Sequence, residues 1–404
     1  MNDIRPIRAT SGTNHEGTSA HNRRVMIDAL RINGALSRAD LARATRLTKQ
    51  TVSNIIDELE GDGLVTFGET VRKGRGQPST PYRLVPEGAF AIGLQIDRHV
   101  TRAIAVDLVG NILARAEANL PLNGPSDGVK VILDLIAQVR GDLAAISTQS
   151  EQRLVGLGAA MPGPFGIEGT GDDPWMMMAW QKFPLVETLA AGTGLDVGLQ
   201  NDAAACATAE RMVGAAHGLD HVVCLYLGYG IGAGLILGGE LYSGANGNAG
   251  EIGMALLSVG GKTTPLEHRA SLASLYQHLD IDAAEAGVYD RIARLADADD
   301  PKILDWIAAA ASDLRWSVHL IETIFDPQTI VLCGGSPAPL AIRLIKAMEP
   351  LLPSNTDRRD RILPRLQLGM TDPWSVALGA AAEPISRAFD PRFSAILKGE
   401  LRRS

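Results

Sequence analysis

The sequence is poor in cysteine and contains no long hydrophobic run. Its three cysteines, Cys206, Cys224 and Cys333, stand far apart in the chain, which argues against a disulfide framework and fits a reducing compartment. The longest apolar runs, such as residues 222–227 and 232–237, are far shorter than the roughly 20 residues that a membrane-spanning helix requires. The first residues are polar and carry no apolar signal segment. We therefore expect a cytoplasmic protein.

Aromatic residues are also scarce, at 4% of the chain, so aliphatic side chains, Ala and Gly must build any core. Hydrophobic residues make up 46% and charged residues 21%, a balance typical of folded globular proteins. With 404 residues the chain is long enough for two or three domains.

Positive charge is in deficit over the whole chain but not at its start. The net charge is −8, yet residues 1–86 carry 13 Lys and Arg against 9 Asp and Glu, a net of +4, and the remainder carries −12. An acidic protein is not expected to bind nucleic acid over its whole surface, so any such binding is confined to the front segment. The alternative is chance variation in surface charge.

Residues 20–86 begin with the pattern of three short helices. Apolar residues from Val25 to Ile32 predict a first helix that ends near Gly34. Ser37 begins a second helix with an approximate capping box, and Thr48 caps a third. The apolar face of the third helix is predicted to consist of Val52, Ile55, Ile56 and Leu59.

The third helix and the loop of a following hairpin carry the candidate DNA contacts. A helix that enters the major groove by its N-terminal end presents its first two turns to base edges, where Gln and Asn pair with adenine and Lys pairs with guanine. Strands at 64–67 and 82–85 are predicted to flank a cationic, glycine-rich wing suited to phosphates or a narrow minor groove. The candidate DNA-binding residues are Lys49, Gln50, Thr51, Ser53, Asn54, Arg72, Lys73, Arg75 and Gln77. The alternative is a small packing domain with a solvated linker.

This front segment resembles the winged helix-turn-helix of regulators in the ROK family (repressors, open reading frames, kinases). The resemblance rests on the run from Ser37-Arg38 to Val65 and on the wing Gly74-Arg75-Gly76-Gln77-Pro78, in which Gln77 replaces the family's usual arginine. It implies that double-stranded DNA is a partner of this chain.

Residues 87–404 alternate predicted strands with predicted helices, which indicates an α/β architecture. The most specific passage spans residues 227–271, with densely spaced glycines and the run Gly-Asn-Ala-Gly-Glu-Ile-Gly at 247–253. It is similar to the sugar-kinase domain of the same family, and the similarity extends from about residue 90 to about residue 382. The resemblance implies a two-lobed fold of the actin and hexokinase type, which is ribonuclease H-like, with a sugar cleft between the lobes.

These patterns divide the chain into five parts. We expect a mobile arm at residues 1–19, the winged helix-turn-helix at 20–86, the first lobe at 87–200 and the second lobe at 201–382. A C-terminal helix and tail at 383–404 is expected to pack on the body.

The resemblance also implies which residues hold the sugar. Asp202 stands where the kinases carry their catalytic base, Asn201 precedes it, and Glu251 and Glu267 match the sugar-binding carboxylates. Carboxylates and amides suit vicinal hydroxyls because each forms paired hydrogen bonds. Met254 stands where the family carries a histidine that touches the sugar. The residues leave a second role open for Asp202, as the N-cap of the helix that follows it.

Two features of the active kinases are missing. Their first phosphate loop, Asp-x-Gly-Gly-Thr, reads Asp97-Arg98-His99-Val100-Thr101 here, and side chains at 99 and 100 obstruct the close approach of backbone N–H groups to phosphate. Tyr229 replaces the usual threonine of the second loop. The family's zinc ligands, a His and three Cys, correspond to Met254, Ser258, Gly260 and Pro265, none of which is a competent ligand. We therefore expect no catalytic residue, no ATP turnover and no metal or other cofactor.

Together these observations predict a repressor of carbohydrate metabolism genes that is controlled by a sugar or sugar derivative. A homodimer or tetramer is expected to place paired recognition helices on a pseudo-palindromic operator. One alternative is an active sugar kinase with a DNA-binding appendage, which the altered phosphate loop argues against because phosphoryl transfer depends on positioning. The other is a regulator controlled by protein docking, with a vestigial sugar pocket.

Overall fold

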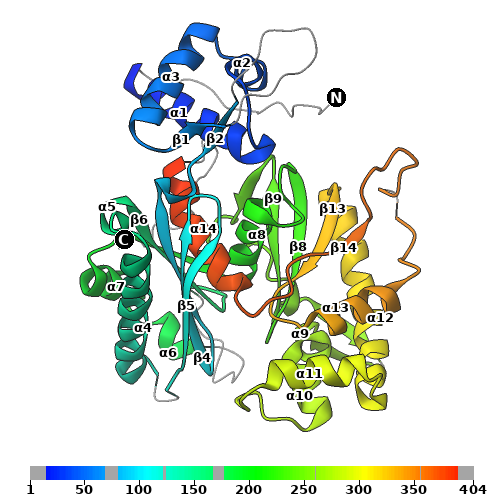
Figure 1. Cartoon of the computed structure of the whole chain (residues 1–404). Helices are drawn as coiled ribbons and strands as arrows, with labels where there is room; N and C mark the ends of the chain where they lie inside the picture. The colour runs from blue at the N-terminus through cyan, green and yellow to red at the C-terminus, as the bar shows by residue number, and fades with distance from the viewer. Residues whose placement is uncertain are drawn as a thin grey trace, which may run out of the picture.

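The computed structural model describes residues 15–68, 81–121, 124–166, 177–259, 261–354 and 356–389. A small helical head lies above a larger body that contains two five-stranded sheets (Figure 1). Within the described parts of the chain, no helix combines the length and the apolar character needed to cross a bilayer.

The head contains three helices and one antiparallel hairpin. Its elements are α1 (His15–Asn33), α2 (Arg38–Thr45), α3 (Lys49–Gly61), β1 (Val65–Phe67) and β2 (Tyr82–Leu84). The predicted apolar face of α3 is confirmed, because all four of its residues are buried. The candidate wing residues Arg72, Lys73, Arg75 and Gln77 lie outside the described residues.

Both predicted helix caps in the head are confirmed. The Ser37 hydroxyl accepts a hydrogen bond from the Asp40 backbone N–H, and the Asp40 carboxylate accepts one from the Ser37 backbone N–H, which forms a complete capping box. The Thr48 hydroxyl accepts from the Thr51 backbone N–H at 3.2 Å. Helix α1 begins at His15, inside the segment 1–19 that the sequence assigned to an arm. The turns of α1 beyond residue 24 are buried, and this packing stabilises the helix. Extending an existing helix into polar residues costs much less free energy than starting a new one, so α1 can continue back to His15.

The two sheets of the body have the same topology. Each begins with three antiparallel strands in chain order and adds two parallel strands on the side of the first strand. The first sheet has the order β5-β4-β3-β6-β7, with β3 (Phe90–Ile96), β4 (Val100–Asp107), β5 (Ile112–Asn119), β6 (Leu154–Met161) and β7 (Val197–Asn201). The second has the order β10-β9-β8-β13-β14, with β8 (His221–Leu227), β9 (Ile231–Leu237), β10 (Glu240–Tyr242), β13 (Thr329–Cys333) and β14 (Leu366–Leu368). Each sheet forms the base of one lobe, as expected.

Helices cover the sheets and fill the space between the lobes. In the first lobe these are α4 (Pro125–Ile146), α5 (Ser150–Arg153), α6 (Met178–Gln181) and α7 (Leu185–Thr193), and a short 3-10 turn, η1 (Pro86–Gly88), leads from the head into β3. The second lobe contains α9 (Glu267–Ala270), α10 (Leu272–Leu279), α11 (Val288–Asp297), α12 (Pro301–Phe325) and α13 (Ala338–Met348), together with the 3-10 turn η2 (Ile252–Met254) and the hairpin β11 (Leu256–Val259) and β12 (Lys262–Pro265). Helices α8 (Asp202–Val213) and α14 (Ser375–Phe389) lie between the two sheets (Figure 1).

Helix α14 packs against both lobes at very short range. It lies on β3 and β6 of the first lobe and on α8 of the second. A Cβ atom at Gly158 would collide with the Ala380 carbonyl oxygen, and one at Gly379 would collide with that of Ala205. Glycine at these two positions is what allows the backbones of β6, α14 and α8 to approach so closely. The two inter-lobe helices therefore form one tightly packed unit.

The C-terminal part expected at 383–404 begins in the middle of α14. The buried face of this helix continues past residue 382 to Ile385, so one packing surface holds the whole helix together although Pro384 lies inside it. The expected border between the lobes at residues 200 and 201 lies one residue before the junction of β7 and α8. Residues 390–404 lie outside the described ones.

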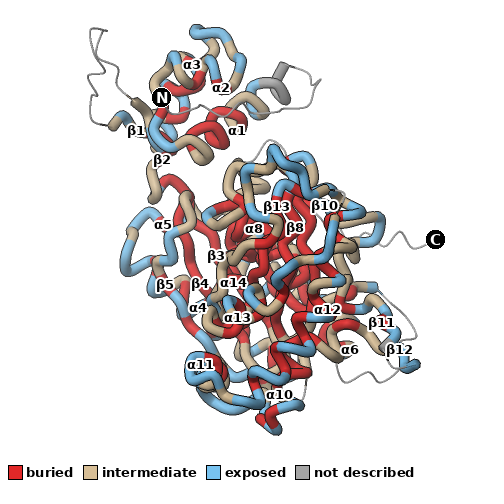
Figure 2. The backbone as a smooth tube through the Cα atoms, turned by 90° about the vertical axis from the view of Figure 1, so that its right-hand side faces the viewer, coloured by how far each residue is buried: buried red, intermediate tan, exposed pale blue. Residues whose placement is uncertain are grey.

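The head and the body share one hydrophobic core. A single cluster of buried side chains joins α1, α2 and α3 of the head to β4, α8 and α14 of the body. At its centre Ile27 of α1 lies near Leu108, Met212 and Ile385 of the body. Figure 2 shows buried backbone on the inner side of the head as well as through the middle of the body. The head is thus part of the folded body rather than a separate module on a linker.

Candidate functional site

The first turns of α3 present polar side chains to solvent. Lys49, Gln50 and Asn54 are exposed, whereas Thr51 and Ser53 are partly buried. The Gln50 side-chain amide donates a hydrogen bond to Asn54 Oδ1 at 2.9 Å, so these two amides are already aligned one helical turn apart. The Thr51 hydroxyl lies 2.8 Å from that of Thr48 and belongs to the cap. The surface that the sequence assigned to base contacts is therefore centred on residues 49, 50 and 54.

Arg38 of α2 holds the next turn of α3 in place. Its guanidinium donates to Ser53 Oγ at 3.3 Å and to Asp57 Oδ1 at 2.6 Å, and it lies 5.3 Å from the centre of the Tyr82 ring. These contacts tie Ser53 to α2 and compensate the negative charge of Asp57 on the exposed side of α3. Ser53 and Asp57 on α3 and Tyr82 on β2 lie far from Arg38 in the chain, so no local sequence pattern indicates this role.

A cleft of about 580 Å³, including space open to solvent, lies between the lobes. All five residues that the sequence assigned to the sugar line it together, although they come from separate segments. They are Asn201, Asp202, Glu251, Met254 and Glu267. The cleft is also lined by Arg98, Tyr226 and Tyr229, which the sequence analysis did not assign to the sugar.

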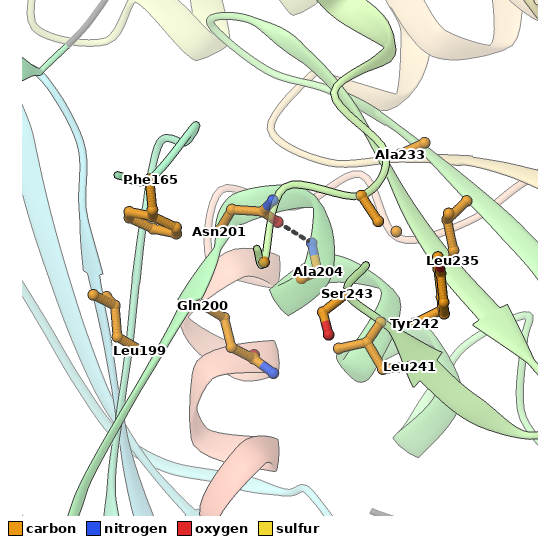
Figure 3. A pocket seen from close by; sticks show the side chains of 13 residues that line it. Phe165, Leu199, Gln200, Asn201, Ala204, Ala233, Leu235, Leu241, Tyr242 and Ser243 are labelled. Atoms are coloured by element: carbon orange, nitrogen blue, oxygen red, sulfur yellow. Dashed lines mark hydrogen bonds between the residues drawn. The ribbon is translucent and has the colours of Figure 1, made fainter. Parts of the chain in front are cut away.

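Asn201 and Asp202 stand where β7 ends and α8 begins. Asn201 is the N-cap of α8, with Oδ1 accepting from the Ala204 N–H at 2.7 Å. The N-cap role that the sequence left open for Asp202 therefore belongs to Asn201 (Figure 3), and Asp202 is the first residue of the helix. Burial raises the pKa of Asp202 well above its usual range, and the charges of Asp97 and Glu251 raise it further. One of its carboxylate oxygens is buried without a hydrogen-bond partner in the described structure.

Glu251 and Glu267 form a pair of carboxylates on the opposite wall. The Asn201 amide donates to Glu251 Oε1 at 3.5 Å, and the Ile231 N–H donates to Glu267 Oε2 at 3.4 Å. Burial, together with the nearby charge of Glu267, raises the pKa of Glu251 to about 7. A Cβ atom at Gly163 would lie 2.7 Å from Glu251 Oε1, so a side chain at this position would displace the carboxylate. The cleft thus presents three carboxyl groups and one amide toward a shared space, a set suited to the hydroxyls of a sugar.

In the turn between β3 and β4, two backbone N–H groups donate to acceptors within the turn itself. The Arg98 N–H donates to Asp97 Oδ1 at 2.7 Å, and the Asp97 N–H donates to the Val100 carbonyl at 3.0 Å. The Arg98 guanidinium lies over the Tyr229 ring, 4.3 Å from its centre, and the His99 ring packs edge-on against the same tyrosine. The segment from Asp97 to Val100 is therefore a turn whose Arg98 and His99 side chains contact Tyr229 of the second lobe.

The positions that correspond to the family's zinc ligands do not fit a zinc ion. Met254 ends η2 with 42% of its surface exposed, and Ser258 and Pro265 lie on the β11–β12 hairpin; Gly260 lies outside the described residues. A thioether, a hydroxyl and a proline ring offer no thiolate, imidazole or carboxylate. Among the described residues, no group of three or more His, Cys, Asp or Glu side chains is arranged to hold a metal.

Comparison with known proteins covers both parts of the chain. Residues 91–363 match the ROK family, and residues 25–76 match the MarR family. The xylose repressor of Bacillus subtilis (strain 168) is 25% identical over 326 residues, which cover 77% of this chain and 81% of that protein. The glucokinase of Halalkalibacterium halodurans is 27% identical over 265 residues, covering 60% and 79%. The solved structure of a ROK family transcriptional regulator, a homologue of the E. coli MLC protein, matches with a TM-score of 0.66 and 22% identity, covering 93% and 97%.

Proposed function

The chain belongs to the ROK family, and we propose that it is a transcription repressor of carbohydrate genes whose DNA affinity is set by a sugar bound between its lobes. The observation that carries this proposal is the presence, in one folded unit, of an exposed row of amides on a winged helix-turn-helix and a cleft lined by carboxylates. The match of the head to the MarR family and the similarity to a xylose repressor over most of both chains support it.

The head recognises DNA through the N-terminal half of α3. Gln50 and Asn54 pair with adenine, and Lys49 pairs with guanine or contacts a phosphate. Thr51 and Ser53 support this surface, and the wing residues Arg72, Lys73, Arg75 and Gln77 contact the backbone or the minor groove. A homodimer or tetramer presents two such heads to the half-sites of a pseudo-palindromic operator.

The cleft holds the effector. Hydroxyl groups of the effector are bound by Asn201, Asp202, Glu251 and Glu267. Met254 lines the cleft with an apolar side chain at the position where the family carries a histidine. This set suits a neutral sugar or sugar derivative. Because the cleft lies between lobes that α8 and α14 join, a ligand that contacts both walls favours one relative position of the lobes.

The chain binds its sugar without phosphorylating it and needs neither zinc nor ATP. The turn at Asp97–Val100 supports this view, since the Arg98 N–H is already bound and its guanidinium is stacked on Tyr229. A second candidate function is sugar kinase activity, favoured by the buried carboxyl group of Asp202 in the cleft and by the similarity to a glucokinase. A coupled assay for ADP with D-glucose and D-xylose separates the two.

The test of the proposal begins with genome-wide capture of DNA bound by the full chain. Affinity for the captured operator is then measured with and without D-xylose, D-glucose and related sugars. Gln50→Ala and Lys49→Ala are each expected to weaken binding by about 1–3 kcal/mol and to relax selectivity at one base pair. Gln277→Ala and Lys130→Ala, which remove the same types of side chain from exposed positions on α10 and α4 of the body, serve as matched controls.

Three results would contradict the proposal or one of its parts. Binding of no duplex together with ATP consumption in the presence of a hexose would identify a kinase. Operator binding that no sugar alters, with no heat of sugar binding in calorimetry, would identify a regulator controlled by protein docking. Equal weakening of all DNA sequences by Gln50→Ala would remove Gln50 from the set of base contacts.

A further inference from the structure

The turn between α2 and α3 begins with an arginine in a backbone conformation that favours glycine. Arg46, which follows the last residue of α2, has φ 59° and ψ 21°, in the left-handed region. Glycine is the usual residue in this conformation and in the turn of a helix-turn-helix, because a Cβ atom strains the backbone there. The other described residues with positive φ are glycines and three aspartates, whose short polar side chains tolerate this region better. Arg46 is therefore a strained residue.

The neighbouring residues explain the turn but not the arginine in it. Leu47 packs against the hydrophobic cluster that joins head and body, and Thr48 is extended because it caps α3. The chain therefore changes direction between Thr45, where α2 ends, and Leu47. Glycine at position 46 would make the same change of direction without strain.

Arg46 and Lys49 are the two cations without a partner in the segment that α2, the turn and α3 form. The two arginines of α2, Arg38 and Arg43, are each bound to a carboxylate. Arg46 and Lys49 are exposed, and neither side chain makes an ion pair or a hydrogen bond with a described residue. Figures 1 and 2 show α2 and α3 on the side of the head that faces away from the body. The two charges are therefore open to a large ligand outside the chain.

Charge is distributed along α3 in the order that disfavours a helix. Acidic side chains stabilise a helix at its N-terminus and basic side chains at its C-terminus. Helix α3 has no acidic residue in its first turn and no basic residue in its last turn, and Asp57, Glu58 and Glu60 lie in its C-terminal half. Lys49 begins the helix, and Arg46 precedes it by three residues. Backbone strain and an unfavourable charge order thus occur together at one end of α3.

We propose that Arg46 binds a DNA phosphate at the edge of the groove that α3 enters, and that this contact offsets the strain and the unfavourable charge order. The proposal rests on the proposed function, because DNA is what brings a phosphate to this end of α3. A guanidinium suits the role, since its planar fork binds two phosphate oxygens at once. Such a contact carries no sequence information and fixes the position of the helix in the groove. Arg46 is therefore a positioning residue for the base contacts of Gln50 and Asn54.

Fluorescence anisotropy of the full chain with two labelled duplexes tests the proposal. One duplex is the operator recovered by genome-wide capture, and the other has the same base composition in scrambled order. Arg46→Gly is expected to weaken binding of both duplexes by the same factor, about tenfold for each bound head. It should also reduce the slope of log K against log salt concentration by about 1 for each bound head. Between about 50 and 200 mM salt, the variant should therefore lose about threefold less affinity per head than the natural protein.

Two further variants separate the contact from backbone strain and from net charge. Arg46→Lys keeps both the charge and the strain, so it should keep the salt slope of the natural protein. Arg43→Ala removes one exposed charge from the same segment and should leave the slope unchanged. Arg46→Gly should in addition raise the melting temperature of the free protein by about 1–2 °C, because glycine relieves the strain.

Three outcomes would overturn the contact and leave the DNA-binding function standing. The first is operator binding by Arg46→Gly with the salt slope of the natural protein. The second is an equal decrease of the slope in Arg43→Ala, which would show that only the net charge of the head matters. The third is a lower melting temperature of Arg46→Gly, which would show that the arginine stabilises the head itself. If the natural protein binds neither duplex, the proposed function is contradicted instead.

Discussion

Replacing Ile27 by alanine tests whether the head and the body fold as one unit. Ile27 lies on α1, is 3% exposed, and contacts the crevice that Leu108, Met212 and Ile385 of the body form. The substitution removes three buried carbon atoms, worth about 2.4 kcal/mol at roughly 0.8 kcal/mol each. The cavity left behind adds to this, so we expect a loss of about 3 kcal/mol in the free energy of unfolding.

Tryptophan fluorescence during urea unfolding is the appropriate assay. All five tryptophans lie beyond residue 170, so this signal reports the body alone, while the substitution lies in the head. In a shared core, Ile27→Ala lowers the urea midpoint of the body transition. Ile324→Ala on α12, at a position 61% exposed, is the control and should change stability by less than about 0.5 kcal/mol.

One outcome would refute the shared core. If the tryptophan-detected midpoint stays the same while the helical signal of the head disappears at lower urea, the head unfolds on its own. The cluster that joins α1 to α14 would then contribute little to stability, despite its burial.

Three further predictions concern ionisation and reactivity. Burial raises the pKa of Glu383 to about 7, so Glu383 favours the folded state only while protonated and its contribution is lost as the pH rises through 7. The stability of Glu383→Gln relative to the natural protein should therefore increase by about 3 kcal/mol between pH 4 and pH 8 in urea titrations, and a constant difference would contradict the assigned pKa. The pKa of Glu251 is also raised to about 7, so its protonation should lower the sugar affinity about tenfold between pH 8 and pH 6. Calorimetry of Glu251→Gln should show a sugar affinity that does not change over this pH range. The three buried cysteines should resist thiol reagents in the folded protein and all react after unfolding, whereas rapid labelling at native pH would show that the core opens.

The sequence predicts those parts of the structure that depend on local pattern. The capping box at Ser37 and the buried face of α3 follow from spacing alone. The five cleft residues were placed together by family resemblance rather than by periodicity. Their shared position in the structure agrees with that placement.

The remaining features depend on contacts between distant segments. Nothing near Arg98 in the sequence indicates that it stacks on Tyr229, and nothing near Asn248 indicates its bonds to Phe165. The three cysteines, far apart in the chain, lie in one buried cluster because α8, β8 and β13 pack together. The Gln200 amide is buried and has no hydrogen-bond partner among the described residues, which likewise becomes apparent only in the folded structure.

The hydrophobic cluster that joins head and body has a thermodynamic consequence. If the sugar changes the affinity for the operator by some factor through this rigid connection, the operator must change the affinity for the sugar by the same factor. Protein bound at an operator and protein free in solution then respond to different sugar concentrations. The number of operator copies, by setting how the protein divides between these two populations, would shift the sugar dose at which the genes respond.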